Sequence, residues 1–333
     1  MKASNDSGFG VIVACCEADY PLAKGCCASL REHLGDVPLT LLVDGDFSVE
    51  AIVRGCDARV MRARGLDPEL AESTGYGLTK MLAFWHSPYE QFLYLDADTI
   101  LWGNPLVGLE IDADLIVNEP HEPYTEFILK SQYFDYDRIF DHTDSFDWRG
   151  CPFFNTGVLV GRRGVLDKRE YLELLAVKKR DHSLLLCGDQ GILNLMVFRG
   201  ASQGRLTVRT APLQTVLPVV AREELERRFQ IVEGRPRIDP IDRTVIHWAG
   251  AKPFSLHRQV FRLPMMHYRR KALAWNSGVS PVPSSLLLWM DEWRADPRQA
   301  MPPEARDGLR RIRRRLSAGP RTPVATMPTR LRP

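Results

Sequence analysis

Short apolar runs alternate with longer amphipathic stretches along most of this chain. The runs are rich in β-branched and aromatic residues, which predicts strands, and the stretches between them carry apolar residues at helical spacing. The strands are predicted at residues 11–14, 39–43, 59–61, 91–95, 114–117, 158–160 and 244–247. The helices are predicted at residues 21–34, 77–86, 166–179 and 189–198. This alternation predicts an α/β fold, with helices on a mostly parallel, Rossmann-like sheet and ligand sites at the carboxyl ends of strands.

The same pattern divides the chain into three regions. Residues 8–276 carry the alternating elements and form the predicted main domain. Residues 277–316 begin with a Pro- and Ser-rich stretch that resembles a linker and end in a basic segment with apolar residues on one helical face. Such a helix could lie on an anionic membrane surface or be a solvated charged helix, and the sequence favours neither. Residues 317–333 are rich in Pro, Thr and Arg, and this composition predicts a disordered tail.

Composition and charge limit the class of protein to which this chain can belong. The 333 residues are 44% hydrophobic and 26% charged, as in ordinary soluble domains, and the net charge of +2 demands no nucleic-acid partner. Residues 291–333 hold eleven Arg and five acidic residues, a net charge of +6, so the rest of the chain carries −4. Seven cysteines without zinc or disulfide spacing, and no signal peptide or membrane span, predict a cytoplasmic protein. Peripheral contact with the inner membrane face and a homo-oligomer remain open.

The sequence Asp96-Ala97-Asp98 follows directly on the predicted strand at residues 91–95. Side chains at positions i and i+2 of an extended segment share one face, so both carboxylates can reach one ion. Such oxygen ligands suit Mg²⁺ or Mn²⁺, which usually complete their shells with substrate phosphates. Taken alone, a solvated acidic turn is the commoner explanation of such a sequence.

Other polar residues lie at the ends of predicted elements. Lys80 begins the helix before the acidic turn, where its charge could reach a diphosphate. Asn155 precedes a strand and offers an amide to hydroxyl groups, while Asp189 and Gln190 open an apolar helix. Each has a purely structural alternative: a surface lysine, a turn residue, and an acid that favours a helix N-terminus.

His247 ends the last predicted strand and is followed by Gly250 and Lys252. This segment offers an imidazole ligand, a backbone that can approach a ligand closely, and a phosphate-binding lysine. A nitrogen ligand shifts the preferred metal from Mg²⁺ toward Mn²⁺. The structural alternative is a core histidine with satisfied hydrogen bonds.

The ordered motifs LTK, YLDADT, FNTGVLV, GDQGILN and HWAGAKP resemble glycosyltransferase family 8, over roughly residues 10–255. This family holds the glycogenin-like and lipopolysaccharide galactosyltransferase-like retaining enzymes of the GT-A fold. The resemblance implies a hexosyltransferase that moves glucose or galactose from a UDP-sugar to an unknown acceptor. It also implies that Asp96 and Asp98, the DxD motif, bind Mn²⁺ together with His247, with Mg²⁺ as a second possibility.

The resemblance further implies roles around the donor. Tyr20 would stack on uracil, Glu17 would lie near its polar edge, and lysines would face the phosphates. The implied donor-binding residues are Ala14, Glu17, Tyr20, Lys80, Asp96, Ala97, Asn155, Gly250 and Lys252. The implied catalytic residues are Asp189, Gln190 and Lys80. Asp189 would stabilise the oxocarbenium-like sugar or act as nucleophile, and Gln190 beneath the anomeric carbon would favour front-side substitution.

Two features leave the substrates open. One residue separates Gly250 from Lys252 where relatives often have two, and Asp147 is the nearest acid where relatives carry one directly before FNxG. The acceptor is expected against the aromatic-rich segment 118–150, although at individual positions the commoner explanation is that an aromatic residue packs an insertion onto the sheet.

Two alternative functions compete with a transferase. A sugar-nucleotide nucleotidyltransferase would share the core and the metal carboxylates, but it would need a Gly-rich basic loop after the first strand. Residues 15–19 form no such loop. A catalytically silent nucleotide-sugar-binding protein is disfavoured because Asp96, Asp98, Asp189 and His247 are all present.

Overall fold

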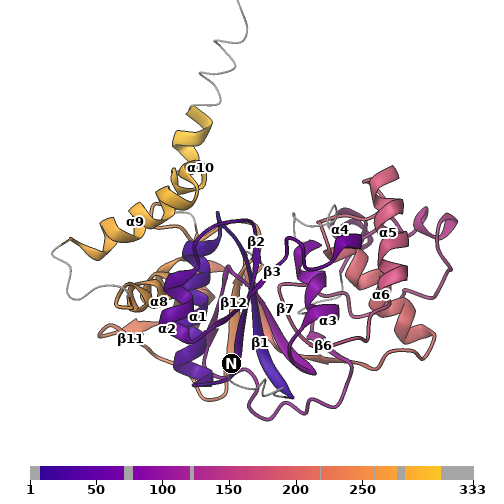
Figure 1. The fold of residues 1–333 in the computed structure, drawn as a ribbon, viewed down its shortest axis with the longest axis horizontal. Helices are drawn as coiled ribbons and strands as arrows, with labels where there is room; N and C mark the ends of the chain where they lie inside the picture. Colours follow the sequence, from indigo (N-terminus) through magenta and orange to yellow (C-terminus); the bar gives the residue numbers. More distant parts are fainter. Residues whose placement is uncertain are drawn as a thin grey trace, which may run out of the picture.

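The computed structural model describes residues 8–70, 78–120, 124–217, 219–257, 260–275 and 282–308. Its centre is a seven-stranded sheet in the order β3-β2-β1-β4-β7-β6-β8 (Figure 1). The strands are β1 Phe9–Cys16, β2 Leu39–Asp44, β3 Arg59–Arg62, β4 Gln91–Asp96, β6 Leu115–Asn118, β7 Val158–Arg162 and β8 Val208–Ala211. Only the pairs that β7 makes with β4 and β6 are antiparallel in this sheet. The predicted α/β fold with a mostly parallel sheet is therefore confirmed.

A second sheet of three strands stands beside the first. Its strands are β5 Thr99–Trp102, β12 Thr244–Trp248 and β9 Gln214–Leu217, in the order β5-β12-β9. The strand expected at residues 244–247 is present as β12, but it belongs to this second sheet. Neither β5 nor β9 was predicted. Because β12 pairs antiparallel with β5, His247 lies opposite Thr99, directly after the acidic turn.

Helices cover both faces of the main sheet (Figure 1). They are α1 Tyr20–Leu34, α2 Glu50–Cys56, α3 Leu82–His86, α4 Glu126–Gln132, α5 Lys168–Arg180, α6 Gln190–Ser202, α7 Arg222–Arg228, α8 Leu263–Leu273, α9 Ser284–Ala295 and α10 Pro297–Ala300. Short 3-10 helices are η1 Pro68–Leu70, η2 Leu78–Met81 and η3 Ile139–Asp141, and β10 Ile231–Val232 with β11 Arg235–Pro236 forms a small hairpin. The helix expected at residues 77–86 is divided into η2 and α3, and Gly77 lies outside the described residues.

The alternation of side chains along β1 explains the two apolar layers. Val11 and Val13 enter the layer beneath α1 and α2, whereas Ile12 enters the layer on the other face, beneath α3, α5 and α6. Since both faces are covered, the strand carries an unbroken apolar run instead of an alternating one.

The aromatic-rich segment before β7 is only partly irregular, because it contains α4 and η3. Tyr133, Phe134, Tyr136 and Trp148 are buried in the layer with α5 and α6. The rings of Tyr136 and Trp148 stack with their centroids 4.0 Å apart. These four aromatics therefore pack the insertion onto the sheet, as the structural alternative expected, whereas Tyr124 is 36% exposed.

The C-terminal helix α9 packs beside α1 and α8, and α10 follows it and packs against α9 (Figure 1). A buried ion pair joins Arg269 of α8 to Glu292 of α9, with side-chain exposures of 1% and 0%. Lys24 of α1 also pairs with Asp291 at 2.5 Å. The basic segment predicted around residues 309–316 and the tail at 317–333 lie outside the described residues. Within the described part of the chain, no helix combines the length and apolar character needed to cross a membrane.

We predict that Glu292→Ala destabilises the protein strongly, because it leaves the Arg269 guanidinium buried without its counter-charge. Removing one partner of a buried pair typically costs about 3–5 kcal/mol of unfolding free energy. Urea denaturation followed by tryptophan fluorescence measures the loss. The control is Glu226→Ala, which removes an exposed partner of Arg222 and should change stability little. Equal losses in the two variants would contradict the prediction.

Candidate functional site

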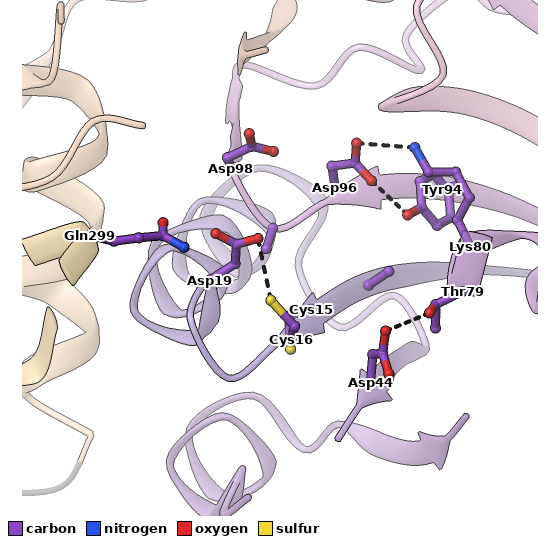
Figure 2. A pocket seen from close by; sticks show the side chains of 12 residues that line it. Cys15, Cys16, Asp19, Asp44, Thr79, Lys80, Tyr94, Asp96, Asp98 and Gln299 are labelled. Atoms are coloured by element: carbon purple, nitrogen blue, oxygen red, sulfur yellow. Dashed lines mark hydrogen bonds and ion pairs between the residues drawn. The ribbon is translucent and has the colours of Figure 1, made fainter. Parts of the chain in front are cut away.

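A pocket of about 540 Å³ opens at the carboxyl ends of β1, β2 and β4 (Figure 2). Parallel strands end at the same edge of a sheet, so their terminal polar side chains meet there. The lining residues are Ala14, Cys15, Cys16, Asp19, Asp44, Thr79, Lys80, Tyr94, Asp96, Ala97, Asp98 and Gln299. The sequence-based expectation that a site lies at this edge agrees with the structure.

Asp96, Asp98 and His247 converge beside this pocket. One potential ligand atom from each lies within 4.8 Å of the others. Asp98 and His247 are buried, and the Asp96 side chain is 27% exposed. The Thr99 hydroxyl donates to the Asp96 carbonyl oxygen at 2.7 Å, which fixes the turn between β4 and β5. The structure therefore brings together the three residues expected to bind a metal.

The hydrogen bonds around His247 determine which ring nitrogen is free. Gln214 donates from Nε2 to the Asn155 carbonyl oxygen at 3.0 Å, so its Oε1 faces the imidazole. His247 Nδ1 donates to that Oε1 at 2.9 Å. With the proton on Nδ1, Nε2 presents its lone pair toward Asp98 and Asp96, at 3.6 and 4.0 Å from their oxygens. This is the orientation that a metal-ligating histidine needs.

The three residues fit a divalent cation. The distances from Nε2 to the carboxylate oxygens are longer than a hydrogen bond. They are short enough for all three ligand atoms to lie about 2 Å from one shared ion. Lys252 forms an ion pair with Asp98 and supplies the positive charge there. Burial alone would raise the pKa of Asp98, but chiefly the positive charge of Lys252 outweighs it and holds this pKa well below its ordinary value. Asp98 is thus negatively charged at neutral pH, as a cation ligand must be.

Lys80 is buried between two carboxylates. Its ammonium lies 3.2 Å from Asp96 and 3.3 Å from Asp189, and it donates to the Thr156 carbonyl oxygen at 3.2 Å. Burial alone would lower the pKa of Lys80, but Asp189 and Asp96 outweigh it and raise this pKa above its ordinary value. Lys80 therefore stays charged and links Asp96, one of the three candidate metal ligands, to Asp189. Its burial excludes the alternative that it is an ordinary surface lysine.

Asp189 and Gln190 begin α6 next to this lysine. Asp189 is buried and makes no side-chain capping hydrogen bond, so it is no ordinary helix cap. Burial raises the pKa of Asp189, with Lys80 acting against this shift. Gln190 Oε1 accepts from Asn155 Nδ2 at 3.2 Å. Asn155 also accepts from the Gly157 backbone N–H, so it acts as a turn residue and as a partner of Gln190.

The loop after β1 lines the pocket with part of the segment expected to hold the uridine. Ala14 lines the pocket, and so do Asp19 and its neighbours Cys15 and Cys16. Glu17 is exposed and is not among the lining residues. Tyr20 packs edge-on against Phe47, with ring centroids 5.5 Å apart, and also lies outside the lining. The uracil-binding roles of Glu17 and Tyr20 therefore remain predictions.

Gly250, Lys252 and Asn155 are likewise not lining residues of the pocket. Gly250 has a φ of 93°, a conformation that favours glycine, and a Cβ there would meet no atom. Lys252 contacts Asp98 at the pocket's edge. Their contacts with phosphate or sugar stay predictions.

Several polar residues at the site were not singled out from the sequence as site residues. Thr79 donates to Asp44 at 2.7 Å, and Tyr94 donates to Asp96 at 2.7 Å. Asp44 could have been found, because it follows a predicted strand directly. Gln214 and Gln299 carried no signal, since they lie on an unpredicted strand and in a region expected to be a linker and basic segment.

Comparison with known proteins supports the fold. No family model and no curated protein sequence matches this chain. The galactosyltransferase LgtC, solved in complex with donor and acceptor sugar analogs, aligns with a TM-score of 0.52 and 17% identity, over 86% of this chain and 99% of LgtC. An active-site mutant of LgtC gives the same values. The glycosyltransferase GlyE of Streptococcus pneumoniae TIGR4 has 17% identity and a TM-score of 0.43, over 87% of this chain and 64% of GlyE. The likeness to LgtC confirms the predicted GT-A fold.

We predict that Gly157→Ala weakens cation binding, because the new Cβ would lie 2.2 Å from His247 Cε1. The imidazole is buried and hydrogen-bonded to Gln214, so it can yield only by leaving its orientation. Disturbing the support of a metal ligand typically costs roughly 10- to 100-fold in metal affinity. Mn²⁺ binding followed by electron paramagnetic resonance tests this. Gly8→Ala, where a Cβ meets open space, should bind like the wild type; unchanged affinity in Gly157→Ala would refute the geometry.

Proposed function

We propose that this protein is a Mn²⁺-dependent retaining glycosyltransferase that moves a hexose, glucose or galactose, from a UDP-sugar to an acceptor. The observation that carries the proposal is the position of His247 Nε2. It faces Asp96 and Asp98 beside a pocket at the carboxyl edge of the sheet. The fold shared with LgtC, which has been solved with donor and acceptor sugar analogs, supports the same function.

The charges around the pocket suit a nucleoside diphosphate leaving group. When the sugar bond breaks, negative charge develops on the diphosphate and positive charge on the sugar ring. A divalent cation, when bound, supplies Lewis-acid stabilisation of that leaving group. Lys80 is buried, charged and fixed by three contacts, so it adds preorganised positive charge. Lys252 can exchange Asp98 for a phosphate oxygen.

The residues at the start of α6 suit the sugar side of the reaction. The Asp189 carboxylate can stabilise positive charge on the ring or attack the anomeric carbon in a double displacement. The Gln190 amide is held by Asn155 and by the Gln132 carbonyl oxygen, to which its Nε2 donates at 3.1 Å. A fixed amide beneath the anomeric carbon favours front-side substitution. The LgtC mutant replaces an active-site Gln by Glu, which supports a role for Gln190.

A nucleotidyltransferase is the second candidate, and the loop after β1 disfavours it. That loop presents Cys15, Cys16 and Asp19 to the pocket, without a glycine-rich basic cradle for a triphosphate. Burial raises the pKa of Asp19, with Lys252 acting against the shift. Without such a cradle, the loop fits a nucleotide-sugar donor whose diphosphate is held by a metal ion better than a free triphosphate.

The first test is donor hydrolysis without acceptor, using UDP-, GDP-, ADP- and dTDP-sugars with Mn²⁺ and measuring the released nucleotide. Cleavage of one UDP-hexose establishes the class and the donor together. Thermal shift with UDP and Mn²⁺ in the same wells identifies an enzyme that needs its acceptor. Absence of both cleavage and UDP binding would overturn the proposal.

We predict that Asp98→Ala abolishes Mn²⁺-dependent UDP binding in titration calorimetry, because it removes the buried anionic ligand. Circular dichroism should show an intact fold. Asp147→Ala removes a carboxylate that is 77% exposed and should leave binding unchanged. UDP affinity in Asp98→Ala equal to that of the control would exclude this metal site.

We also predict that Asp189→Asn and Gln190→Ala lower kcat by about 100-fold or more and change the donor KM little, because both residues act on the developing charge. Initial rates at varied donor concentration separate the two parameters. Gln203→Ala, at the other end of α6, is the control. A pure KM effect would assign these residues to binding instead.

A further inference from the structure

The C-terminal helix α10 contributes one residue to the lining of the pocket. Eleven of the twelve lining residues belong to the segment from Ala14 to Asp98, and the twelfth is Gln299 of α10. Figure 2 shows its side chain extending from α10 toward Asp19, at the end of the pocket where Asp98 lies. Among the described residues, no group hydrogen-bonds the Gln299 side-chain amide, so it is free to bind a ligand.

A buried histidine fixes α10 against the loop that carries Lys252. Both ring nitrogens of His257 face backbone carbonyl oxygens, which can only accept hydrogen bonds. Nδ1 lies 2.9 Å from the Lys252 oxygen, and Nε2 lies 2.9 Å from Gln299 and 3.2 Å from Met301. His257 is 4% exposed, and its ring packs edge-on against Phe254. One side chain therefore sets the spacing between Lys252 and Gln299.

A second connection holds the same loop to α9. Glu292 accepts from the Ser255 backbone N–H at 2.8 Å and from its hydroxyl at 2.6 Å, while it also pairs with Arg269. The loop after β12 is thus attached to both C-terminal helices. Lys252, which pairs with Asp98, and Gln299 belong to one fixed unit.

The charges that line the pocket indicate which part of a ligand Gln299 contacts. The lining contains four acidic residues and one basic residue: Asp19, Asp44, Asp96, Asp98 and Lys80. Gln299 lies at the end near Asp98 and the loop of Lys252, where the cation and the diphosphate are proposed. A neutral amide can donate N–H groups to phosphate oxygens there without adding another negative charge.

We propose that α9 and α10 are a built-in part of the donor site, in which the Gln299 amide contacts the diphosphate of the nucleotide-sugar and His257 is the positioning residue that aligns Gln299 with Lys252. This inference rests on the proposed function and extends the site beyond the motifs of the main domain. It makes the C-terminal helices a determinant of nucleotide affinity.

The experiment measures UDP and uridine binding by titration calorimetry, with Mn²⁺, in the full-length wild type and in Gln299→Ala, Gln299→Glu and Arg298→Ala. Loss of a hydrogen bond to a charged phosphate should weaken UDP binding about tenfold in Gln299→Ala. Gln299→Glu should weaken it further, because a carboxylate repels the diphosphate. Uridine binding should be the same in all four proteins. Arg298 is an exposed neighbour on α10 and should leave UDP affinity unchanged.

The outcomes separate this inference from the proposed function. Wild-type protein that binds no UDP with Mn²⁺ overturns both. Wild-type binding with equal UDP affinity in Gln299→Ala and Arg298→Ala overturns only the role of Gln299. Equal losses for uridine and UDP in Gln299→Ala would place the contact on the nucleoside and overturn the assignment to the diphosphate.

A double-mutant cycle tests the positioning role of His257. His257→Phe keeps a ring against Phe254 but removes the ring nitrogens that contact both chain segments. If His257 positions Gln299, adding Gln299→Ala to His257→Phe should reduce UDP affinity by clearly less than the tenfold expected in the wild type. Additive losses, as a general destabilisation would give, refute the positioning role.

Discussion

The candidate site depends on the turn where the chain passes from the main sheet into the second sheet. The Asp96 backbone N–H donates to the Gly157 carbonyl oxygen at 2.8 Å, and the Asp98 carbonyl oxygen accepts from the Trp248 N–H at 3.1 Å. The backbone of Asp96 is therefore held by the main sheet, and the backbone of Asp98 is held by β12, which also carries His247. Backbone pairing between elements, and not packing of side chains alone, fixes these three residues. A cation site built in this way is preorganised by the fold itself.

The acids of the pocket are balanced by two lysines, which are the groups that the proposed diphosphate would contact. Lys252 neutralises Asp98 and Lys80 lies between Asp96 and Asp189. An anion alone would meet a carboxylate-lined wall, and a cation alone would compete with Lys252 for its ligand. Joint binding of a cation and a diphosphate would remove both conflicts, because Lys252 would then pair with a phosphate and leave Asp98 to hold the cation. The arrangement of charges thus suits the proposed pair of cation and diphosphate better than either ion alone.

The sequence predicts the site best where chemistry follows a strong local pattern. The acidic turn follows an apolar run with two aromatic residues, and His247 follows an apolar β-branched run, so the sequence pattern alone places both at strand ends. The second sheet could not be predicted in the same way. Its strands β5 and β9 have only four residues each, and β5 is buried throughout, so neither shows a periodicity. Gln214, which orients His247, was missed for that reason. Gln299 was missed because composition beyond residue 277 indicates a linker, while the contacts that attach it are tertiary.

The attachment of the C-terminal helices is polar at its centre, and this has a physical consequence. A buried ion pair such as that of Arg269 with Glu292 gains little stability over apolar side chains of similar size, because both charges lose their water. What the Glu292 carboxylate adds is a set of directional hydrogen bonds. Its oxygens receive the guanidinium of α8 together with the N–H and hydroxyl of Ser255, three residues beyond Lys252. An apolar residue at Glu292 could fill the same space without selecting one position of that loop. The polar contact therefore couples the placement of α9 to the placement of Lys252, the lysine that pairs with Asp98.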